Sequence, residues 1–597
     1  MSTIAAALEV RSRAVVGGWR LATLVAFVFA AGCANGLDRI DRSVEALLRE
    51  GTGVINAEHG PDRPVDHAIE TPALDAWARR PPTLNPDASA LSFDPIDRED
   101  ANAVIERLAG YSELPEDAQQ LDLAGALAYA VTRSREHRFA SEEYVLSALR
   151  LLIERHQWGP RFFDDVSATI DAVGDDALYD TSLALVNEFT VSQRLPYGGT
   201  VSATALASAV EDLHQRVAGE NVQSASIILA ADVPLLRGAG RVAHESRVQA
   251  ERDLIYAARS YERFRREFLF DIARDYLTLV ELHRRSVNAE VGVDSFRKLE
   301  QQQQALYDAG RSTPFDMAEA QNETLEAIDS LNSALESYRL ALDRFKSRIG
   351  FPVDEPLLIA VDALDLPVPT VDLVESVTMG LQYRLDLQTS RDEVLDARRL
   401  VEVARNNTEA DLDLLASITL PTDDERDRAG LRFDTEATRF QAGVTYGLPL
   451  DREIERLGVR QSQISLARAE RGYAQSRDDV AIDVRSAVRG IDSARFSLQI
   501  QEANVEIAQQ RVASIEADPV KADVRQKTDA ISQTVRARNA RDSARRDLQV
   551  AVLLYLLETG QLRVDGSGRI EPLAGMEPPA AAVPEPAEPA GGRPAGG

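Results

Sequence analysis

The sequence has little cysteine, few aromatic residues and no long apolar segments. Its 597 residues include one cysteine, and aromatic side chains make up 6% of the chain. A single cysteine excludes an internal disulfide and a multi-thiolate metal site. The low aromatic content argues against a compact enzyme core. Past the N-terminal region, no segment approaches the roughly 20 apolar residues of a membrane-spanning helix. If the chain crosses a membrane, it must therefore do so as a closed β-barrel.

Basic charge and clustered metal-ligand residues are also in short supply. The net charge is −29, whereas a nucleic-acid-binding protein normally presents a basic face. The seven histidines are scattered along the chain, and no two have the helical spacing of metal ligands. Carboxylates are abundant, but abundance does not make a catalytic pair. We therefore predict no enzyme activity, no metal, no cofactor and no nucleic-acid partner.

The one cysteine, Cys33, lies directly after an apolar segment in "FVFAAGCANG". Residues 21–32 are apolar or small and follow three arginines, which is typical of a secretory signal peptide. The sequence Ala-Ala-Gly-Cys resembles a bacterial lipobox, in which the cysteine is acylated with a fatty acid such as palmitate and becomes the first residue. Ala34 follows it, as in lipoproteins sent to the outer membrane. The alternative is an ordinary secreted protein cut near Ala31, with a free thiol.

The two ends of the mature chain differ from its middle. Residues 33–118 are polar and rich in turn-forming residues, which predicts an extended N-terminal arm held by the lipid on Cys33. Residues 566–597 are rich in proline, alanine and glycine, which predicts a disordered tail. Neither end has the bulky apolar residues of an independent core.

The middle of the chain predicts long helices with heptad spacing. Apolar residues recur at steps of three and four in two segments, as they do in coiled coils. The first seam is Val480, Val484, Ala487, Ile491, Ala494, Leu498, Gln501, Val505, Ala508, Val512 and Ile515, and the second is Ile328, Leu331, Leu335, Tyr338, Leu342, Phe345 and Ile349. Residues 452–517 and 241–308 each predict a helix about 100 Å long at 1.5 Å per residue. Helices of this length indicate a rod or a bundle.

Four other segments alternate apolar and polar residues. They are residues 183–191, 225–233, 412–420 and 440–448. One apolar and one polar face over about ten residues is what a transmembrane barrel strand requires. A half-buried sheet in a water-soluble protein shows the same alternation. The signal peptide and the lipobox favour the membrane interpretation.

Segments from the first half of the chain resemble segments from the second half. "VPLLRGAGRVAHESR" from Val233 is similar to "LPLDREIERLGVRQS" from Leu448, and "LDLAGALAYAV" from Leu121 is similar to "VDLVESVTMGL" from Val371. These pairs predict two repeats, 119–360 and 361–565, with the same order of helix, strands and long helical hairpin.

Taken together, these segments resemble the TolC-like outer membrane efflux channel family over about residues 121–564. "YRLDLQTSRDEVLDARRLVEVAR" is similar to the family's Arg-Pro-Asp-Leu helix start, with Leu385 in place of the proline. "AADVPLL" and "GVTYGLPL" resemble its strand-to-helix junction, with Pro234 and Pro449 ending the strands. "YDAGRSTPFDMAEAQ" from Tyr307 resembles the tip of its helical hairpin.

The resemblance implies a mainly α fold with a β-barrel portion. Each protomer would contribute four or so transmembrane strands, and three protomers would form one barrel in the outer membrane, continued by a helical tunnel in the periplasm. The homotrimer would be a passive duct for efflux or type I secretion. Its partners would be a periplasmic adaptor protein, an inner-membrane pump and outer membrane lipid. An acidic lumen would favour cations.

The resemblance also implies two hairpin tips that would face the adaptor. Gly310, Ser312, Thr313 and Pro314 form the first. The second, in "EADPVKADVRQK", has no glycine, and Asp518 and Pro519 are expected to make the turn because helix is disfavoured before proline. Near it, Asp523 and Asp529 are candidate gate acids, and a solvated helix end is the simpler interpretation of each.

Two other kinds of protein stay open at this point. A periplasmic coiled-coil scaffold lipoprotein would share the helices and the lipid but would not need alternating strands. An enzyme or binding module on a helical stalk would need a compact region with convergent polar groups, and only the N-terminal arm has room for one.

Overall fold

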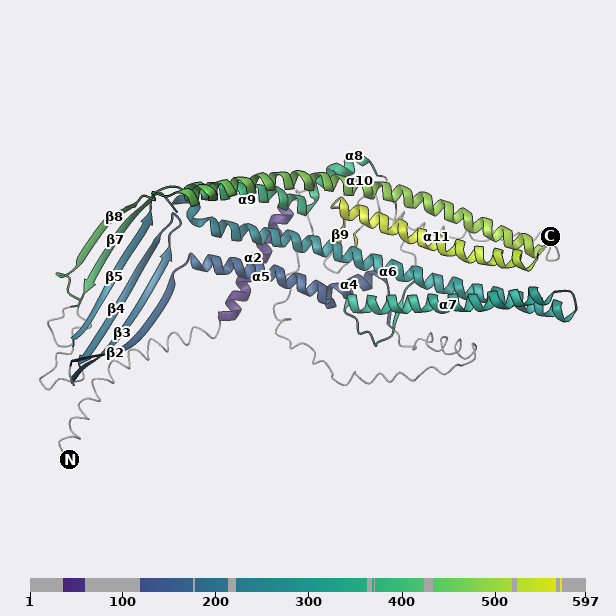
Figure 1. The fold of residues 1–597 in the computed structure, drawn as a ribbon, viewed down its shortest axis with the longest axis horizontal. Helices are drawn as coiled ribbons and strands as arrows, with labels where there is room; N and C mark the ends of the chain where they lie inside the picture. Colours follow the sequence, from purple (N-terminus) through teal and green to yellow (C-terminus); the bar gives the residue numbers. More distant parts are fainter. Residues whose placement is uncertain are drawn as a thin grey trace, which may run out of the picture.

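The structure is a computed structural model that describes residues 36–58, 119–175, 178–212, 222–361, 368–369, 371–422, 433–517, 523–564 and 570–571. The described chain is elongated, with the strands at one end and the helices extending away from them (Figure 1). Several predicted features lie outside the described residues: the signal peptide, Cys33, Asp518, Pro519 and residues 59–118 of the arm.

Six antiparallel strands form one sheet in the described part of the chain, in the order β2-β3-β4-β5-β7-β8. They are β2 (Arg161–Asp175), β3 (Leu178–Arg194), β4 (Thr200–Asp212), β5 (Val222–Pro234), β7 (Asp411–Pro421) and β8 (Arg439–Gly447). The four segments with alternating residues are confirmed as β3, β5, β7 and β8. The expected number of four or so was too low, because β2 and β4 were missed.

The helices occur as two matching sets. The first set is α4 (Leu123–Arg133), α5 (Arg135–Gln157), α6 (Glu245–Asp308) and α7 (Pro314–Ile349), with a short 3-10 helix, η3 (Gly240–His244), before α6. The second set is α8 (Leu373–Tyr383), α9 (Leu385–Asn406), α10 (Glu453–Ala517) and α11 (Val524–Glu558). The predicted internal duplication is confirmed in the helices, because each member of the first set has a counterpart in the second.

The two longest helices make the molecule a rod. α6 has 64 residues and α10 has 65, so each is about 100 Å long, as predicted. α6 forms a hairpin with α7, and α10 forms one with α11 (Figure 1). The predicted seam of α10 faces this packing, since Val480, Val484 and Ile491 are at most 2% exposed.

The main core lies where the four long helices and the short helix α4 meet, partway along the rod. Its fully buried members come from all five helices, and they include Leu127, Phe268, Ile272, Leu279, Phe345, Val484, Leu553 and Leu556. β1 (Gln119–Leu121) pairs in parallel with β6 (Leu357–Ile359) beside this core. The Tyr276 hydroxyl donates to the carbonyl oxygen of Ala360 at 2.7 Å, which ties α6 to this small sheet.

Two predictions about the ends of the chain were wrong. Residues 36–58 form a helix, α2 (Gly36–Glu58), and not an extended arm. Leu47 and Leu48 lie three and four residues after Val44, so all three share one helix face, which packs on α5 and α6. In the predicted tail, β10 (Ile570–Glu571) pairs antiparallel with β9 (Arg563–Val564), so these two residues of the tail belong to a small sheet.

Candidate functional site

One face of the sheet is apolar across all six described strands. Side chains alternate between the two faces of a strand, and residues paired between strands share a face. The pairings place Val191 beside Phe162 and Ala203, and Ile418 beside Leu229 and Phe440. The apolar members with described side chains are Phe162, Val166, Ala168, Ile170, Leu185, Phe189, Val191, Val201, Ala203, Ala205, Ala207, Ala225, Ile227, Leu229, Ala231, Val233, Leu412, Leu414, Ala416, Ile418, Leu420, Phe440, Ala442, Val444 and Tyr446.

This apolar face is open to the surroundings of the single chain. Phe440, Val444 and Ile170 are 71%, 63% and 66% exposed. Exposed apolar patches of this extent mark a membrane or protein contact in folded proteins. Asp164 and Asn187 interrupt the face near its helical end, and there the Asn187 amide donates to Asp164 at 2.8 Å.

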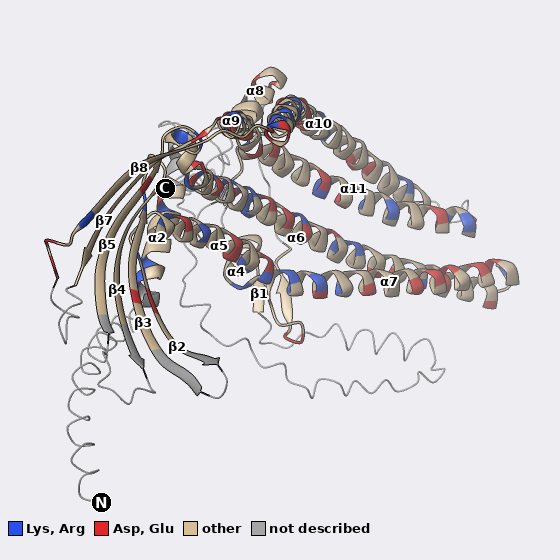
Figure 2. Cartoon of the chain, turned by 60° about the vertical axis from the view of Figure 1, so that its left-hand side comes forward, with Lys and Arg blue, Asp and Glu red and all other residues tan. Residues whose placement is uncertain are grey.

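The opposite face of the sheet is rich in small hydroxyl side chains. Thr190 and Thr204 hydrogen-bond across β3 and β4 at 2.9 Å, and Ser208 and Ser224 do so across β4 and β5 at 2.7 Å. Figure 2 shows that the described strands carry far fewer charged residues than the helices do. The sheet therefore has one apolar face and one face that is polar and mainly uncharged.

Within the described ranges, no helix combines the length and the apolar composition needed to cross a bilayer. The same residues hold no group of three histidine, cysteine, aspartate or glutamate side chains placed to bind a metal ion.

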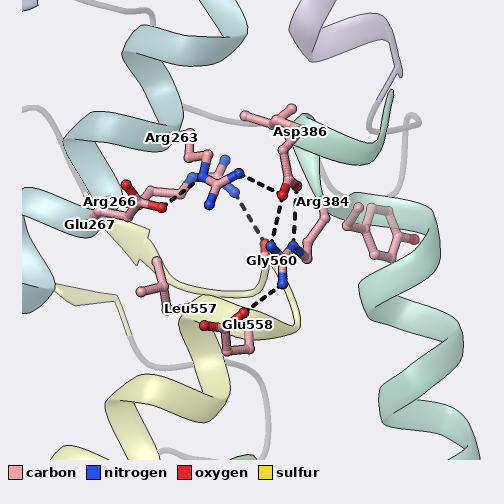
Figure 3. Close-up of a pocket in the computed structure, with 10 residues that line it drawn as sticks. Arg263, Arg266, Glu267, Arg384, Asp386, Leu557, Glu558 and Gly560 are labelled. Atoms are coloured by element: carbon pink, nitrogen blue, oxygen red, sulfur yellow. Dashed lines mark hydrogen bonds and ion pairs between the residues drawn. The ribbon is translucent and has the colours of Figure 1, made fainter. Parts of the chain in front are cut away.

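A network of ion pairs joins four helices at the junction of α8 and α9. Figure 3 shows the part of it that links Arg263, Asp386, Arg384 and Glu558. The Arg384 guanidinium donates to Glu558 at 2.6 Å, to Asp386 at 2.7 Å and to Asp483 at 3.0 Å. Arg263 of α6 pairs with the same Asp386. The network thus connects α6, α9, α10 and α11 partway along the rod, and we call it the waist network.

The charges of the waist network shift one another's pKa values. Burial alone would lower the pKa of Arg384, but its hydrogen bond to Asp386 and the nearby carboxylates raise it. Burial alone would raise the pKa of Asp386, but the hydrogen bond and charge of Arg384 and the charge of Arg263 lower it. Burial raises the pKa of Glu558, helped by Asp483 and opposed by Arg384. The network therefore holds its arginines and Asp386 in their charged forms.

The first hairpin tip joins α6 to α7, and the four predicted tip residues build it. Gly310 has φ +68 and follows the end of α6, where a left-handed residue favours glycine. Ser312 donates to the Gln303 side chain at 3.2 Å. Thr313 caps α7 in a reciprocal capping box with Asp316, and Pro314 is the first residue of that helix.

The second tip is described only from Asp523 onward. The Asp523 side chain accepts a hydrogen bond from the Gln526 amide at 2.7 Å and caps α11. Asp529 is exposed. The motif Asp-x-x-Gln is a recognisable cap signal, so the sequence alone could have given Asp523 this structural role.

Acidic side chains from both tips lie near each other. Burial raises the pKa of Glu323 in α7, and the charges of Glu326, Glu319 and Asp529 raise it further. Because Asp529 belongs to α11, this repulsion acts between the two hairpins. Arg525 of α11 opposes it by pairing with Glu319 at 3.5 Å. Sequence reasoning missed Glu323, since only the fold brings α7 beside α11.

Known proteins resemble this chain in structure but not in sequence. No protein-family model matches the sequence, and no curated protein sequence matches it. The solved structure of CusC, described for transmembrane channel formation, is 11% identical, with a TM-score of 0.57 over 73% of this chain and 92% of CusC. The outer-membrane channel OprN is 14% identical, with a TM-score of 0.57 over 75% of this chain and 91% of OprN.

A third structure is the Campylobacter jejuni CmeC outer membrane channel, which is 14% identical. It has a TM-score of 0.52 over 74% of this chain and 85% of CmeC. Each of the three likenesses extends over about three quarters of this chain. The resemblance expected from the sequence is thus confirmed at the level of fold: this chain has the fold of the TolC-like outer membrane channels.

Proposed function

We propose that the chain is the outer membrane channel of a tripartite efflux or type I secretion system. In this role, copies of the chain form a passive duct that carries small molecules or polypeptides from the periplasm to the exterior. No bond is made or broken by the protein. The pump and the adaptor supply the energy and select the cargo.

The observation that supports the proposal most strongly is the two-faced sheet on the end of long helices. An apolar outer face and a polar inner face are what a water-filled barrel in a lipid bilayer requires. The helices that continue from the strands are about 100 Å long, which is enough to extend the duct far from the membrane.

The sheet also weighs against the alternative of a periplasmic scaffold lipoprotein. A scaffold would use the helices and the lipid, but it would leave the apolar sheet face in water without a purpose. That face costs free energy when it is exposed, at about 25 cal/mol for each Å² of apolar surface.

The proposal includes the parts of the system that surround the channel. A lipid on Cys33 anchors the N-terminus in the outer membrane after removal of the signal peptide 1–32. α2 follows within a few residues and packs on α5 and α6, so the anchor is tied to the rod. The tips built from Gly310, Ser312, Thr313 and Pro314, and around Asp518 and Pro519, dock the adaptor, with Asp523 and Asp529 near the gate.

Conductance across a planar lipid bilayer tests the function. The full-length protein is extracted from outer membranes in mild detergent and added to the bilayer. The proposal predicts discrete conductance steps that favour cations. A matched control is the variant Leu229→Arg, which puts a charge on the apolar face and should not insert. A protein that leaves the membrane without detergent and gives no conductance would contradict the proposal.

A further inference from the structure

We propose that the additional β2–β3 hairpin is part of the channel wall, so that each copy of the chain contributes six strands. Strand β8 of one copy then pairs with strand β2 of the next, and the outer face of α10 packs on α5 of that next copy. We call this junction the seam. This inference rests on the proposed function, because the seam is what closes the duct.

The two edges of the sheet are open and suited to each other. Within the described residues, β2 and β8 each have a partner strand on one side only. β2 has 15 residues and β8 has nine, with no proline in either. Natural proteins protect long edges of this kind, because they associate readily with other strands. Joining the two edges removes both of them.

The directions of the strands also allow the join. All five pairings in the sheet are antiparallel, and the number of strands is even. β2 therefore runs away from the helices and β8 runs back toward them. A junction between β8 and β2 of the next copy is then antiparallel, like every other pairing in the sheet.

The apolar face continues across this junction. It contains Phe162, Val166 and Ile170 in β2, and Phe440, Val444 and Tyr446 in β8. All six side chains are 60–71% exposed, whereas Leu229 and Ile418 on inner strands are 47% and 41% exposed. The edge strands thus lack a neighbour that the inner strands have.

The helix that follows β8 carries a second, unburied apolar stripe. At about 100° per residue, its positions lie along one side of α10, opposite the buried seam of Val480, Val484 and Ile491. They are 42–66% exposed, and they are Leu457, Ile464, Ile482, Phe496, Ile500 and Ile507. We call them the outer stripe of α10. A helix with apolar residues on two opposite sides has a partner on both.

The helix that precedes β2 carries a matching stripe. Phe139, Leu146 and Ile153 of α5 are seven residues apart and 68%, 45% and 62% exposed. Ile153 and Leu146 lie four and eleven residues before the end of α5, and Leu457 and Ile464 lie four and eleven residues after the start of α10. The two stripes therefore stand at equal distances from the sheet.

α10 and α5 lie at the two borders of the helical layer, just as β8 and β2 lie at the two edges of the sheet. α10 packs on α9 and α11, and α5 packs on α6, so α10 and α5 lie at opposite borders of the helical layer (Figure 1). α5 leads into β2, and β8 leads into α10. One rotation from copy to copy therefore joins both pairs of borders, which is the geometry of a closed head-to-tail ring.

The seam determines the size of the pore. Three copies of a six-stranded sheet close into an 18-stranded wall, and barrels of roughly 16–18 strands leave an aqueous channel. If β2 and β3 lay outside the wall, the same three copies would form a barrel of only 12 strands.

Cysteine cross-linking in outer membranes tests the seam. The chain has one native cysteine, Cys33, so the unmodified chain gives the background. Leu146→Cys with Ile464→Cys probes the helices. The control is Leu146→Cys with Leu466→Cys, because Leu466 lies two residues further and on the opposite side of α10. Val444→Cys is combined in turn with Phe162→Cys, Val166→Cys or Ile170→Cys to probe the strands.

The seam predicts dimers and trimers on denaturing gels for the helix pair and for one of the strand pairs, and none for the control. Cross-links of Val444→Cys to Ala203→Cys, Ala205→Cys or Ala207→Cys in β4 would overturn the seam, since β2 and β3 would then lie outside the wall. The absence of all these cross-links would also overturn it. Conductance of the same preparations separates the two questions: a conducting channel without cross-links rejects the seam and keeps the proposed function.

Discussion

The two repeats agree in their helices and differ in their strands. α4 and α8 both have 11 residues, α5 and α9 have 23 and 22, α6 and α10 have 64 and 65, and α7 and α11 have 36 and 35. In the described chain, the first repeat contributes four strands to the sheet and the second contributes two. One additional hairpin accounts for the difference.

The contrast shows where this fold can vary. Helices that pack on each other along their whole length must keep matching lengths, because a change would unpair buried residues. Strands can be added only two at a time, because the chain must return to the helical end before the next long helix begins. The sheet is therefore the part of the molecule in which size can change in whole hairpins.

The agreement extends to single residues at the helix ends. Asp122 caps α4 and Asp372 caps α8, each accepting a hydrogen bond from the amide three residues later. Gly350 and Gly560 end α7 and α11 with φ of 80 and 71. A Cβ atom on Gly350 would lie 2.4 Å from the Arg133 carbonyl oxygen, and one on Gly560 would lie 3.1 Å from that of Tyr383.

The largest effect is expected on the sheet, where both repeats contribute to one apolar face. Ile418→Arg places a charge on that face, at a cost of roughly 2–4 kcal/mol near the bilayer centre. We expect loss of the protein from the outer membrane fraction. Ser417→Arg is the matched control, because the adjacent residue points to the polar face. Equal losses for both variants would show that the faces are not distinguished.

A smaller effect is expected at the waist network, which joins Arg263 of the first repeat to Asp386 of the second. Arg384→Ala leaves three carboxylates without their shared donor, and hydrogen bonds to charged groups contribute roughly 1.5–3 kcal/mol. Urea unfolding of the detergent-solubilised protein should show a decrease of this size in the free energy of unfolding. Arg398→Ala removes an exposed pair with Glu470 and should cost less than about 1 kcal/mol. Similar losses for both would contradict a stabilising role for the network.

A pH-dependent effect on stability is expected from His137, the third residue of α5. The third residue of α9 is Leu387, which does not titrate. Burial, together with Arg265, lowers the pKa of His137 to about 4. The neutral ring favours the folded state above the ordinary pKa of about 6.5, and this stability is lost as the pH falls toward 4.

Between pH 7.5 and pH 5, His137 lowers the free energy of unfolding by about 2 kcal/mol. His137→Leu, which introduces the residue found at the equivalent position of the second repeat, should remove this pH dependence. Unfolding curves at the two pH values measure the difference. If the variant kept the full pH dependence, His137 would not be its source.

The smallest effect is expected where the two hairpins meet near their tips. Glu323→Gln removes a carboxylate whose pKa is raised by burial and by Glu326, Glu319 and Asp529. The repulsion between these carboxylates in the folded state is present above the raised pKa of Glu323 and disappears as the pH falls through that pKa. At neutral pH, Glu323→Gln should therefore remove the repulsion that mild acid removes in the unmodified protein. Hydrogen exchange of α7 and α11 near the tips should slow at neutral pH. Glu336→Gln, on an exposed part of α7, is the control and should leave it unchanged.

Much of the fold could be predicted because its signals repeat over long distances. The seam of α10 extends through about ten turns, and β3, β5, β7 and β8 alternate clearly. β4 was missed because its apolar face is built largely of the small residues Ala203, Ala205 and Ala207, whereas the larger apolar residue Leu206 lies on the opposite face. In β2 the alternation is broken by Phe163 and Asp164.

The candidate site was predictable only where its signals are local. The first tip has a glycine, a capping threonine and a proline in sequence, and these identify a helix end and a helix start. The waist network joins Arg384 to residues about 100 and 174 positions away. Glu323 and Asp529 are similarly distant in sequence. No spacing rule in a single sequence reports such contacts, because tertiary packing creates them.

The most direct measurement is a cryo-electron microscopy map of the full-length protein in mild detergent. If copies of the chain share one wall and one hollow rod, the map will show three copies, a closed wall to which each contributes six strands, and a hollow helical extension about 100 Å long. A solid single rod, or copies whose sheets do not meet, would contradict it.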